Sequence, residues 1–253
     1  MNIYFKQNPW GHFCLIEKDL ISNTINKHNY WEPHLIYFYE KMIKPGDLVV
    51  DAGANIGFHT VQFAKLTTEK GKVISFEPQP LIYNVLTTNI LLNNLTSIVE
   101  QHKLGLCDKV TLRRMTPLSD QIFSEGCINY GGRGISNEGE EEVNTVLIDD
   151  FNLKRLDFLK MDIQGSELEA LNGGLNTINK FKPIIFLENY KDNTKDQQVM
   201  NFLLELGYTC RRLIGNHNED CILLDDKKHK KEKEIIINNQ HFEYEENNIL
   251  STK

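Results

Sequence analysis

From residue 31 onward, hydrophobic and polar residues follow a repeated pattern. Short apolar runs, typical of buried parallel strands, precede stretches in which apolar residues recur every three or four positions, as on one face of a helix. The predicted strands are 48–50, 72–77, 97–103, 156–162 and 183–188, and the predicted helices are 31–43, 56–64, 80–92, 166–181 and 196–206. Alternation of this kind builds a mostly parallel sheet with helices on both faces.

The pattern changes near the end of the chain. Residues 208–214 and 221–224 are apolar runs joined by a polar turn rather than by a helix, which predicts a hairpin. The last strand of the sheet should therefore be antiparallel. The predicted fold class is α/β, a doubly wound, Rossmann-like and mostly parallel sheet of seven strands with an antiparallel last strand.

Three segments lie outside this core pattern. Residues 1–30 alternate aromatic and polar positions around a Pro-Gly turn and predict an N-terminal arm or short hairpin. The main domain is assigned to 31–225, with two strand-like runs, 110–115 and 143–148, around a glycine-rich loop insertion at about 115–142 near the ligand-bearing edge. Residues 226–253 form a charge run and a polar stretch, from which we expect a solvated C-terminal tail.

Composition narrows the class of protein. The 253 residues carry 28 Lys and Arg against 35 Asp and Glu, a formal charge of −7 that argues against a broad nucleic-acid footprint. Five widely spaced cysteines form neither a disulfide framework nor a metal clip, which favours a reducing compartment. The chain opens without a signal-peptide pattern, and no stretch reaches the roughly 18 apolar residues of a membrane helix. We expect a soluble, cytoplasmic protein.

A glycine turn is the strongest local motif. It follows the 48–50 strand and comprises Asp51, Gly53, Ala54, Asn55 and Gly57. Glycines there let the backbone turn sharply and approach a ligand closely, beyond the carboxyl ends of the strands. The spacing lacks the middle glycine of a dinucleotide fingerprint, which favours S-adenosylmethionine, whose ammonium group Asp51 could bind directly or through water.

The next two strands end in further candidate cofactor residues. Glu77 ends the second strand, where a carboxylate can accept hydrogen bonds from both ribose hydroxyls of a nucleoside. Since NAD and S-adenosylmethionine share that ribose, Glu77 alone does not separate them. After the third strand, Leu106 could pack on an adenine ring, and Asp108 could accept from its amino group.

The fourth and fifth strands end in candidate catalytic residues. Asp162 ends the fourth strand, and Glu188 and Asn189 end the fifth, so all three are expected at the crevice. Within the insertion, Tyr130 and Arg133 could stack on and hydrogen-bond a sugar, or could belong to a flexible surface loop. The chain's other candidates for acid–base chemistry, including His59, are predicted to be packing or surface histidines.

The ordered set of motifs resembles the FkbM family of S-adenosylmethionine-dependent methyltransferases. The resemblance is carried by DLVVDAGANIGFHT, FEPQP, LGLCD, VLIDDF, LKMDIQGSELEALNGG and KPIIFLE, over roughly residues 32–190. It implies a class I methyltransferase fold with sheet order 3-2-1-4-5-7-6, and methyl transfer usually to a hydroxyl of a sugar or a glycosylated small molecule. One position departs from the family's K-x-D-x-E-G pattern, because Gln164 stands where the family usually has an acid.

Two mechanisms fit these residues. In the first, Asp162 receives the hydroxyl proton or holds the hydroxyl, and Glu188 assists. In the second, Asp162, Glu188 and Asn189 supply oxygen ligands to a Mg²⁺ ion. The expected acceptor is a saccharide or small molecule, with no nucleic acid and no membrane segment. An RNA methyltransferase and a catalytically inactive S-adenosylmethionine-binding or scaffold protein are the alternatives, the latter favoured by Gln164.

Overall fold

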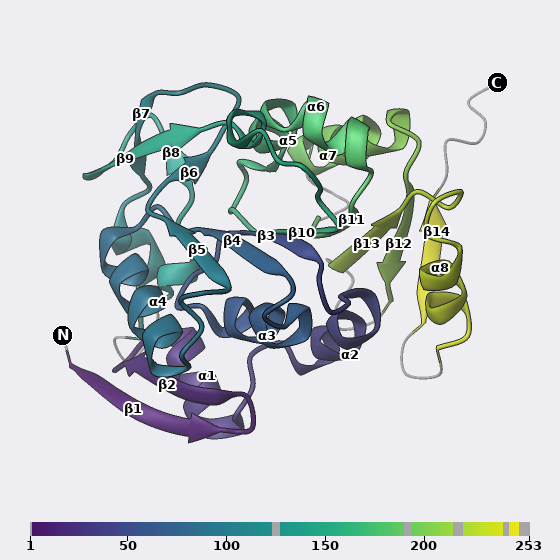
Figure 1. Ribbon diagram of the computed structural model, residues 1–253. Helices are drawn as coiled ribbons and strands as arrows, with labels where there is room; N and C mark the ends of the chain where they lie inside the picture. Colours follow the sequence, from purple (N-terminus) through teal and green to yellow (C-terminus); the bar gives the residue numbers. More distant parts are fainter. Residues whose placement is uncertain (1, 123–126, 190–193, 215–219, 240–242, 248–253) are drawn as a thin grey trace.

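An eight-stranded sheet forms the centre of the computed structural model (Figure 1), which describes residues 2–122, 127–189, 194–214, 220–239 and 243–247. Its strands lie in the order β14-β12-β13-β11-β10-β3-β4-β5. Their bounds are β3 (Leu48–Ala52), β4 (Lys72–Phe76), β5 (Val99–His102), β10 (Phe158–Met161), β11 (Ile184–Glu188), β12 (Thr209–Leu213), β13 (Asp220–Leu224) and β14 (Tyr244–Asn247).

Seven of these strands confirm the predicted fold class. The five strands β5, β4, β3, β10 and β11 are parallel to one another, whereas β13 is antiparallel to both β11 and β12. This is the order 3-2-1-4-5-7-6. The eighth strand, β14, was not predicted, and it pairs antiparallel with β12 at the edge of the sheet.

Helices cover both faces of the sheet (Figure 1). One face carries α2 (Pro33–Met42), α3 (Phe58–Thr67) and α4 (Pro80–Leu92), and the other carries α5 (Glu167–Gly173), α6 (Leu175–Phe181) and α7 (Thr194–Glu205). Alternate strand residues feed the two cores, as Val49 and Val50 do. None of the helices in the described residues is long and apolar enough to cross a membrane.

The helix predicted over 166–181 is divided into α5 and α6. The break falls at two successive glycines, where the chain passes close to its neighbours. A Cβ on Gly173 would lie 2.0 Å from the Cys107 carbonyl oxygen, and one on Gly174 would lie 3.1 Å from Ile148. These close contacts leave little room for a side chain at either position, and two successive glycines disfavour a continuous helix.

The described part of the N-terminal segment, residues 2–30, packs on the core. β1 (Ile3–Asn8) and β2 (Gly11–Ile16) form the predicted hairpin, and Phe13, Leu15 and Ile16 are fully buried. Asn89 of α4 fixes the hairpin, since its side-chain oxygen accepts from the Cys14 N–H at 2.6 Å. Helix α1 (Leu20–His28) was not predicted.

The insertion folds as a separate small sheet. Its strands are β6 (Gly105–Leu106), β7 (Leu112–Met115), β8 (Ile135–Ser136) and β9 (Glu141–Val146), in the order β6-β9-β7-β8. Short 3₁₀ helices η1 (Leu118–Gln121), η3 (Tyr130–Gly132) and η4 (Ile148–Phe151) lie around it. β7 and β9 lie largely at the two predicted strand-like runs, whereas β8 and η3 add regular structure within the stretch expected to be a loop.

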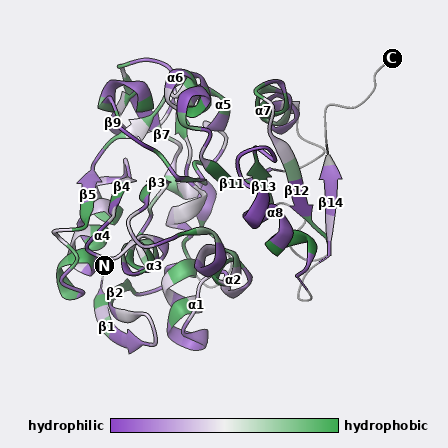
Figure 2. Cartoon of the chain, turned by 45° about the vertical axis from the view of Figure 1, so that its right-hand side comes forward, coloured by the Kyte–Doolittle hydropathy of each residue, from purple (hydrophilic) through white to green (hydrophobic). Residues whose placement is uncertain are grey.

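The C-terminal segment differs from the solvated tail that its composition predicts. Residues 230–237 form α8 (Lys230–Ile237), and β14 extends the sheet. β14 is hydrophilic along its length (Figure 2), and ion pairs join it to β12 in addition to the backbone pairing of the two strands. Arg211 of β12 lies 3.0 Å from Glu246, and Arg212 lies 3.7 Å from Glu245. Because β14 contacts β12 through charged side chains, its sequence has no apolar alternation from which a strand could be predicted.

Candidate active site

A cavity of about 220 Å³ lies beyond the carboxyl ends of β3, β4, β10 and β11. Seven of the predicted site residues line it, namely Gly53, Ala54, Asn55, Glu77, Leu106, Asp162 and Glu188. The structure thus brings together the glycine turn, the second-strand carboxylate and both predicted catalytic acids. Asp51, Gly57, Asp108 and Asn189 lie outside this lining, and their predicted contacts with a ligand stay predictions.

The glycine turn is shaped by contacts with two neighbouring strands. The backbone N–H groups of Gly53 and Ala54 donate to the Phe76 carbonyl at 3.0 and 2.9 Å. Gly53 has φ +78°, and a Cβ there would lie 1.9 Å from the Asp162 carbonyl oxygen. Gly57 serves helix packing instead, since its Cβ would lie 2.5 Å from Leu86 of α4.

Glu77 is held at the cavity by the backbone. It is 3% exposed, and its two carboxylate oxygens accept from the Asn55 N–H at 3.0 Å and the Gln79 N–H at 2.9 Å. Burial raises the pKa of Glu77 to about 7, against these hydrogen bonds. Because each carboxylate oxygen has a second lone pair, both remain able to accept from a ligand.

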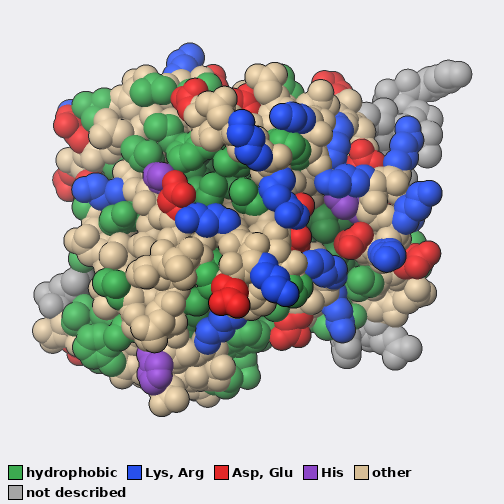
Figure 3. Space-filling view, viewed as in Figure 1, with side chains coloured by type: hydrophobic (Ala, Val, Ile, Leu, Met, Phe, Trp, Pro, Cys, Tyr) green, Lys and Arg blue, Asp and Glu red, His purple; other side chains and the backbone are tan. Residues whose placement is uncertain are grey.

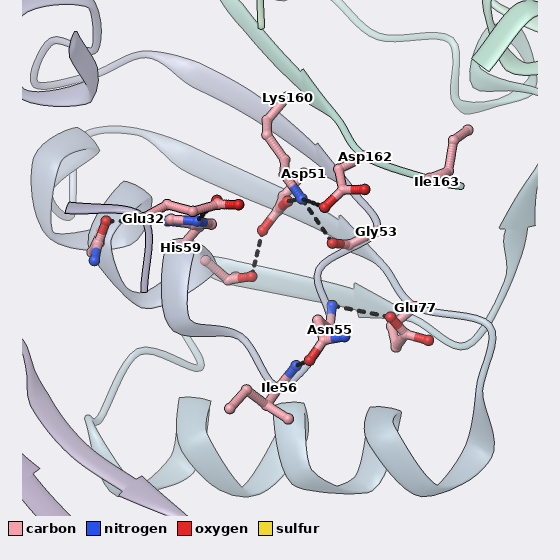
Figure 4. A network of polar contacts seen from close by, with 12 residues as sticks. Glu32, Asp51, Gly53, Asn55, Ile56, His59, Glu77, Lys160, Asp162 and Ile163 are labelled. Carbon is pink, nitrogen blue, oxygen red and sulfur yellow. Dashed lines mark hydrogen bonds and ion pairs between the residues drawn. The ribbon is translucent and has the colours of Figure 1, made fainter. Parts of the chain in front are cut away.

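A buried lysine organises the carboxylates around the turn (Figure 4). Lys160 Nζ donates to the Gly53 carbonyl at 2.8 Å and lies 3.7 Å from Asp51 and 3.8 Å from Asp162. Asp51 is fully buried and accepts from the Thr60 hydroxyl at 2.6 Å. Asp51 therefore supports the turn from beneath, and Lys160 lines the cavity, a position that sequence reasoning missed.

The environments of Asp162 and Glu188 favour different protonation states of the two carboxyl groups. Burial raises the pKa of Asp162, while Lys160 and a hydrogen bond from Gln164 favour its charged form. Burial, followed by the charge of Asp162, raises the pKa of Glu188 to about 9. At neutral pH, Glu188 thus holds a proton, and Asp162 is the better candidate for accepting one.

Gln164 has a definite place in this arrangement. It lies in the left-handed region with φ +53°, and its side-chain amide donates to the Asp162 carboxylate at 2.5 Å. An acid in the same conformation would face a second carboxylate at hydrogen-bond distance. The departure from the family pattern therefore replaces a repulsive contact in this geometry with a hydrogen bond.

The three candidate Mg²⁺ ligands are not assembled. Asn189 is 2% exposed, and its side-chain oxygen accepts from Arg212 at 2.6 Å, away from the cavity. The Asp162 carboxylate instead has the Lys160 ammonium beside it as counter-charge. Over the described ranges, no group of three or more His, Cys, Asp or Glu side chains could hold a metal ion. The surroundings of the Asp162 carboxylate therefore suit the ammonium group of Lys160 better than a divalent cation.

Two further cavity residues were not predicted. His59, predicted to be a packing or surface histidine, lines the cavity together with Glu32, and its Nε2 lies 2.9 Å from the Glu32 carboxylate. The pair joins the start of α3 to the start of α2, which a sequence pattern does not reveal.

The two insertion residues proposed for sugar binding have separate roles. Arg133 lines the cavity and lies 2.8 Å from Glu141. Tyr130 is buried, and its carbonyl accepts from the Gln79 side chain at 2.9 Å. Tyr130 thus anchors the insertion to the loop after β4.

Segments far apart in the sequence cover this cavity. The Leu20 N–H donates to the Ile128 carbonyl, and the Ile128 N–H donates to the Lys18 carbonyl, each at 2.8 Å. Residues 18–21 and 128–133, which we call the cover, also meet where a Cβ on Gly131 would lie 2.9 Å from Ile21. The N-terminal segment and the insertion therefore form one wall.

Comparison with known proteins identifies the family. The methyltransferase FkbM domain model matches residues 51–210. Methyltransferase sdnD of Sordaria araneosa is 29% identical over 154 residues, covering 49% of this chain and 59% of that protein. The match with this first relative thus spans about three-fifths of its length. Hexuronic acid methyltransferase AglP of Haloferax volcanii is 26% identical over 182 residues, covering 70% of each.

A solved structure supports the same assignment at the level of fold. Methyltransferase FkbM from Methylobacillus flagellatus KT matches with a TM-score of 0.52 at 21% identity, covering 75% of this chain and 50% of that one. Together with the strand order, the match identifies the class I methyltransferase fold. The family model covers more than half of the chain, so the chain belongs to the FkbM methyltransferase family.

Proposed function

We propose that the protein is an S-adenosylmethionine-dependent O-methyltransferase that acts on a hydroxyl of a sugar, a glycan or a glycosylated small molecule. The observation that carries the proposal is the single cavity shared by Glu77, the glycine turn, and the acids Asp162 and Glu188. One part of its lining suits a nucleoside, and another offers groups for proton transfer.

The residues present fit S-adenosylmethionine. Glu77 offers two carboxylate oxygens to the ribose hydroxyls, as expected for this strand end. Phe76, Leu106 and Ile163 supply an apolar surface suited to the adenine. The cavity is also lined by Asp162, whose carboxylate favours a positively charged ligand.

In the proposed reaction, this chain positions the acceptor and takes up its proton. Bound S-adenosylmethionine supplies an electrophilic methyl group, so the acceptor oxygen gains a methyl carbon as the carbon–sulfur bond breaks. Asp162 accepts the hydroxyl proton, and Lys160 and Gln164 stabilise its charged form beforehand. Glu188, which holds a proton at neutral pH, donates a hydrogen bond that orients the acceptor.

The saccharide class is supported by a relative's name and by the charge distribution. AglP is a hexuronic acid methyltransferase, and it matches 70% of this chain. An RNA substrate would favour an extended basic surface. On the face shown in Figure 3, Lys and Arg side chains lie mainly on the right-hand side of the view and have acidic side chains among them. The formal charge of −7 points the same way.

Labelled S-adenosylmethionine tests the proposal. Purified protein is incubated with a panel of free glycans, nucleotide sugars, RNA and cell extract. We expect label to enter a saccharide, and label entering RNA or protein instead would contradict the substrate class. Isothermal titration with S-adenosylmethionine is the parallel measurement, because a folded protein that does not bind it would favour a scaffold role.

Two controls address the mechanism. Asp162→Asn should reduce turnover by about 100-fold or more, within the range of general acid–base catalysis, with cofactor binding retained. Near-normal turnover by this variant would remove Asp162 as the base. Activity that falls in EDTA and returns with Mg²⁺ would instead support the metal mechanism.

A further inference from the structure

Trp31 and Glu32 enter the cavity from outside the region that matches the family model. Both lie just before α2, and both line the cavity, whereas the match begins at residue 51. Glu32 has φ +46° and ψ +61°, a left-handed conformation that is unfavourable for a glutamate. It also precedes Pro33, which restricts its backbone further. Backbone strain of this kind persists only where surrounding contacts fix the residue, and strained residues cluster at active sites and ligand-binding sites.

His59 holds Glu32 in that conformation. Its Nε2 lies 2.9 Å from Glu32 Oε2, and both side chains are largely buried. Burial alone would raise the pKa of Glu32, but the hydrogen bond and charge of His59 outweigh it and lower the pKa. Glu32 therefore presents an ionised carboxylate to the cavity beside the indole of Trp31, and a carboxylate only accepts hydrogen bonds.

Each basic side chain in the described cavity lining already faces a carboxylate of this chain. Lys160 lies 3.8 Å from Asp162, Arg133 lies 2.8 Å from Glu141, and His59 lies 2.9 Å from Glu32. An acceptor with its own carboxylate would meet Glu32 and Asp162 without gaining a new cation partner. A ring with neutral hydroxyls would instead supply the donors that these carboxylates need.

From this geometry we infer that Trp31 and Glu32 form the acceptor subsite, and that its ligand is an uncharged sugar ring rather than a uronic acid. The indole face packs on the C–H face of the ring, and the Glu32 carboxylate accepts from its hydroxyls. His59 is a positioning residue that keeps the carboxylate turned into the cavity. This inference rests on the proposed function and narrows its substrate class.

The chain contains two tryptophans, which allows direct detection of the ligand. Trp10 lies in the β1–β2 turn, apart from the cavity lining, so Trp10→Phe leaves Trp31 as the single reporter. The probes are three matched pairs: the methyl glycosides of glucose, galactose and mannose, and the corresponding uronic acids. We expect at least one neutral glycoside to change Trp31 fluorescence and to accept label. Its uronic acid partner should show a KM at least about tenfold higher, which corresponds to about 1.4 kcal/mol.

Matched variants separate binding from folding and from cofactor effects. Trp31→Ala and Glu32→Gln should each raise KM for the accepted glycoside by about tenfold, and the Kd for S-adenosylmethionine should stay within about twofold. The controls are Trp10→Ala, which removes the other indole, and Glu40→Gln, which neutralises an exposed glutamate of the same helix α2. Both should leave KM unchanged.

Each contrary result has its own meaning. If a saccharide is methylated but Trp31→Ala and Glu32→Gln keep the original KM, the subsite is wrong and the proposed function stands. Equal use of a uronic acid and its neutral partner, or preference for the uronic acid, overturns the inferred substrate class. If label enters none of the saccharides and appears in RNA or protein, both the subsite and the proposed function are overturned.

Discussion

At the scale of single residues, Gly53 leaves no room for a side chain where β3 meets the cavity. Gly53→Ala should destabilise the protein by at least about 3 kcal/mol, because it combines a left-handed backbone with a clash against the Asp162 carbonyl. Gly207→Ala is the matched control, since Gly207 has φ +86° with open space around it. It should cost only about 1–2 kcal/mol. Urea unfolding of both variants measures the difference, and equal losses would contradict the role of the close approach.

If Glu77 binds the ribose as proposed, cofactor affinity should depend on pH. Its pKa of about 7 means that the carboxylate is mostly protonated at pH 6 and mostly ionised at pH 8. The Kd for S-adenosylhomocysteine should therefore be up to about tenfold weaker at pH 6 than at pH 8. Glu77→Gln should weaken binding by about tenfold at pH 8 and lose most of the pH dependence. Glu100→Gln, at a strand residue outside the cavity, should change neither, and isothermal titration at both pH values decides.

Glu188 should make stability fall as pH rises. Its pKa is raised to about 9 from the ordinary 4.5, so the folded state keeps a proton that the unfolded state has released. This contribution is complete below about pH 4.5 and is lost as pH rises through about 9. The glutamine of Glu188→Gln cannot ionise. The Tm of the variant relative to that of the wild type should therefore be higher at pH 9 than at pH 5. A Tm difference that is the same at both pH values would contradict the burial of Glu188.

At the scale of elements, β14 depends on charge pairing with β12. Arg211 is fully buried and lies 2.8 Å from Asp226 and 3.0 Å from Glu246. Glu246→Gln should cost about 1–2 kcal/mol, because Asp226 retains part of the pairing and Glu246 is one-third exposed. Glu142→Gln breaks a pair in which both side chains are about half exposed, and it should cost almost nothing. Equal effects on urea unfolding would argue against an ionic edge.

Hydrophobic periodicity predicts the elements whose burial depends on apolar contacts. It identifies the seven core strands and most of their helices, because each buries a regular apolar face against the sheet. It misses α1, which places only Ile21, Ser22 and Ile25 in the interior. It also misses β14, whose partners are arginines. Elements that bury few apolar residues or are joined by charge lack the repeating signal on which the prediction depends.

At the scale of the whole molecule, the part of the cavity formed by consecutive strand ends could be predicted, and the part formed by Trp31, Glu32 and His59 could not. Residues 51–57 and Glu77 lie at consecutive strand ends, so local sequence and sheet order indicate their meeting place. Trp31, Glu32 and His59 come together only through the docking of α2 beside α3. Lys160 was not predicted, because a lysine within an apolar strand is usually expected at the surface. In the structure it is buried beside Asp51 and Asp162.

The cover gives the site a particular order of assembly. Its two halves are separated by more than a hundred residues, so their hydrogen bonds are contacts of high sequence separation. During synthesis, residues 18–21 emerge long before residue 128, and the strands carrying Asp162 and Glu188 follow later still. The first segment of the chain must therefore wait for the middle of the chain before the cavity can close. Methyltransferase competence should consequently appear as one of the last events of folding, after the central sheet has formed.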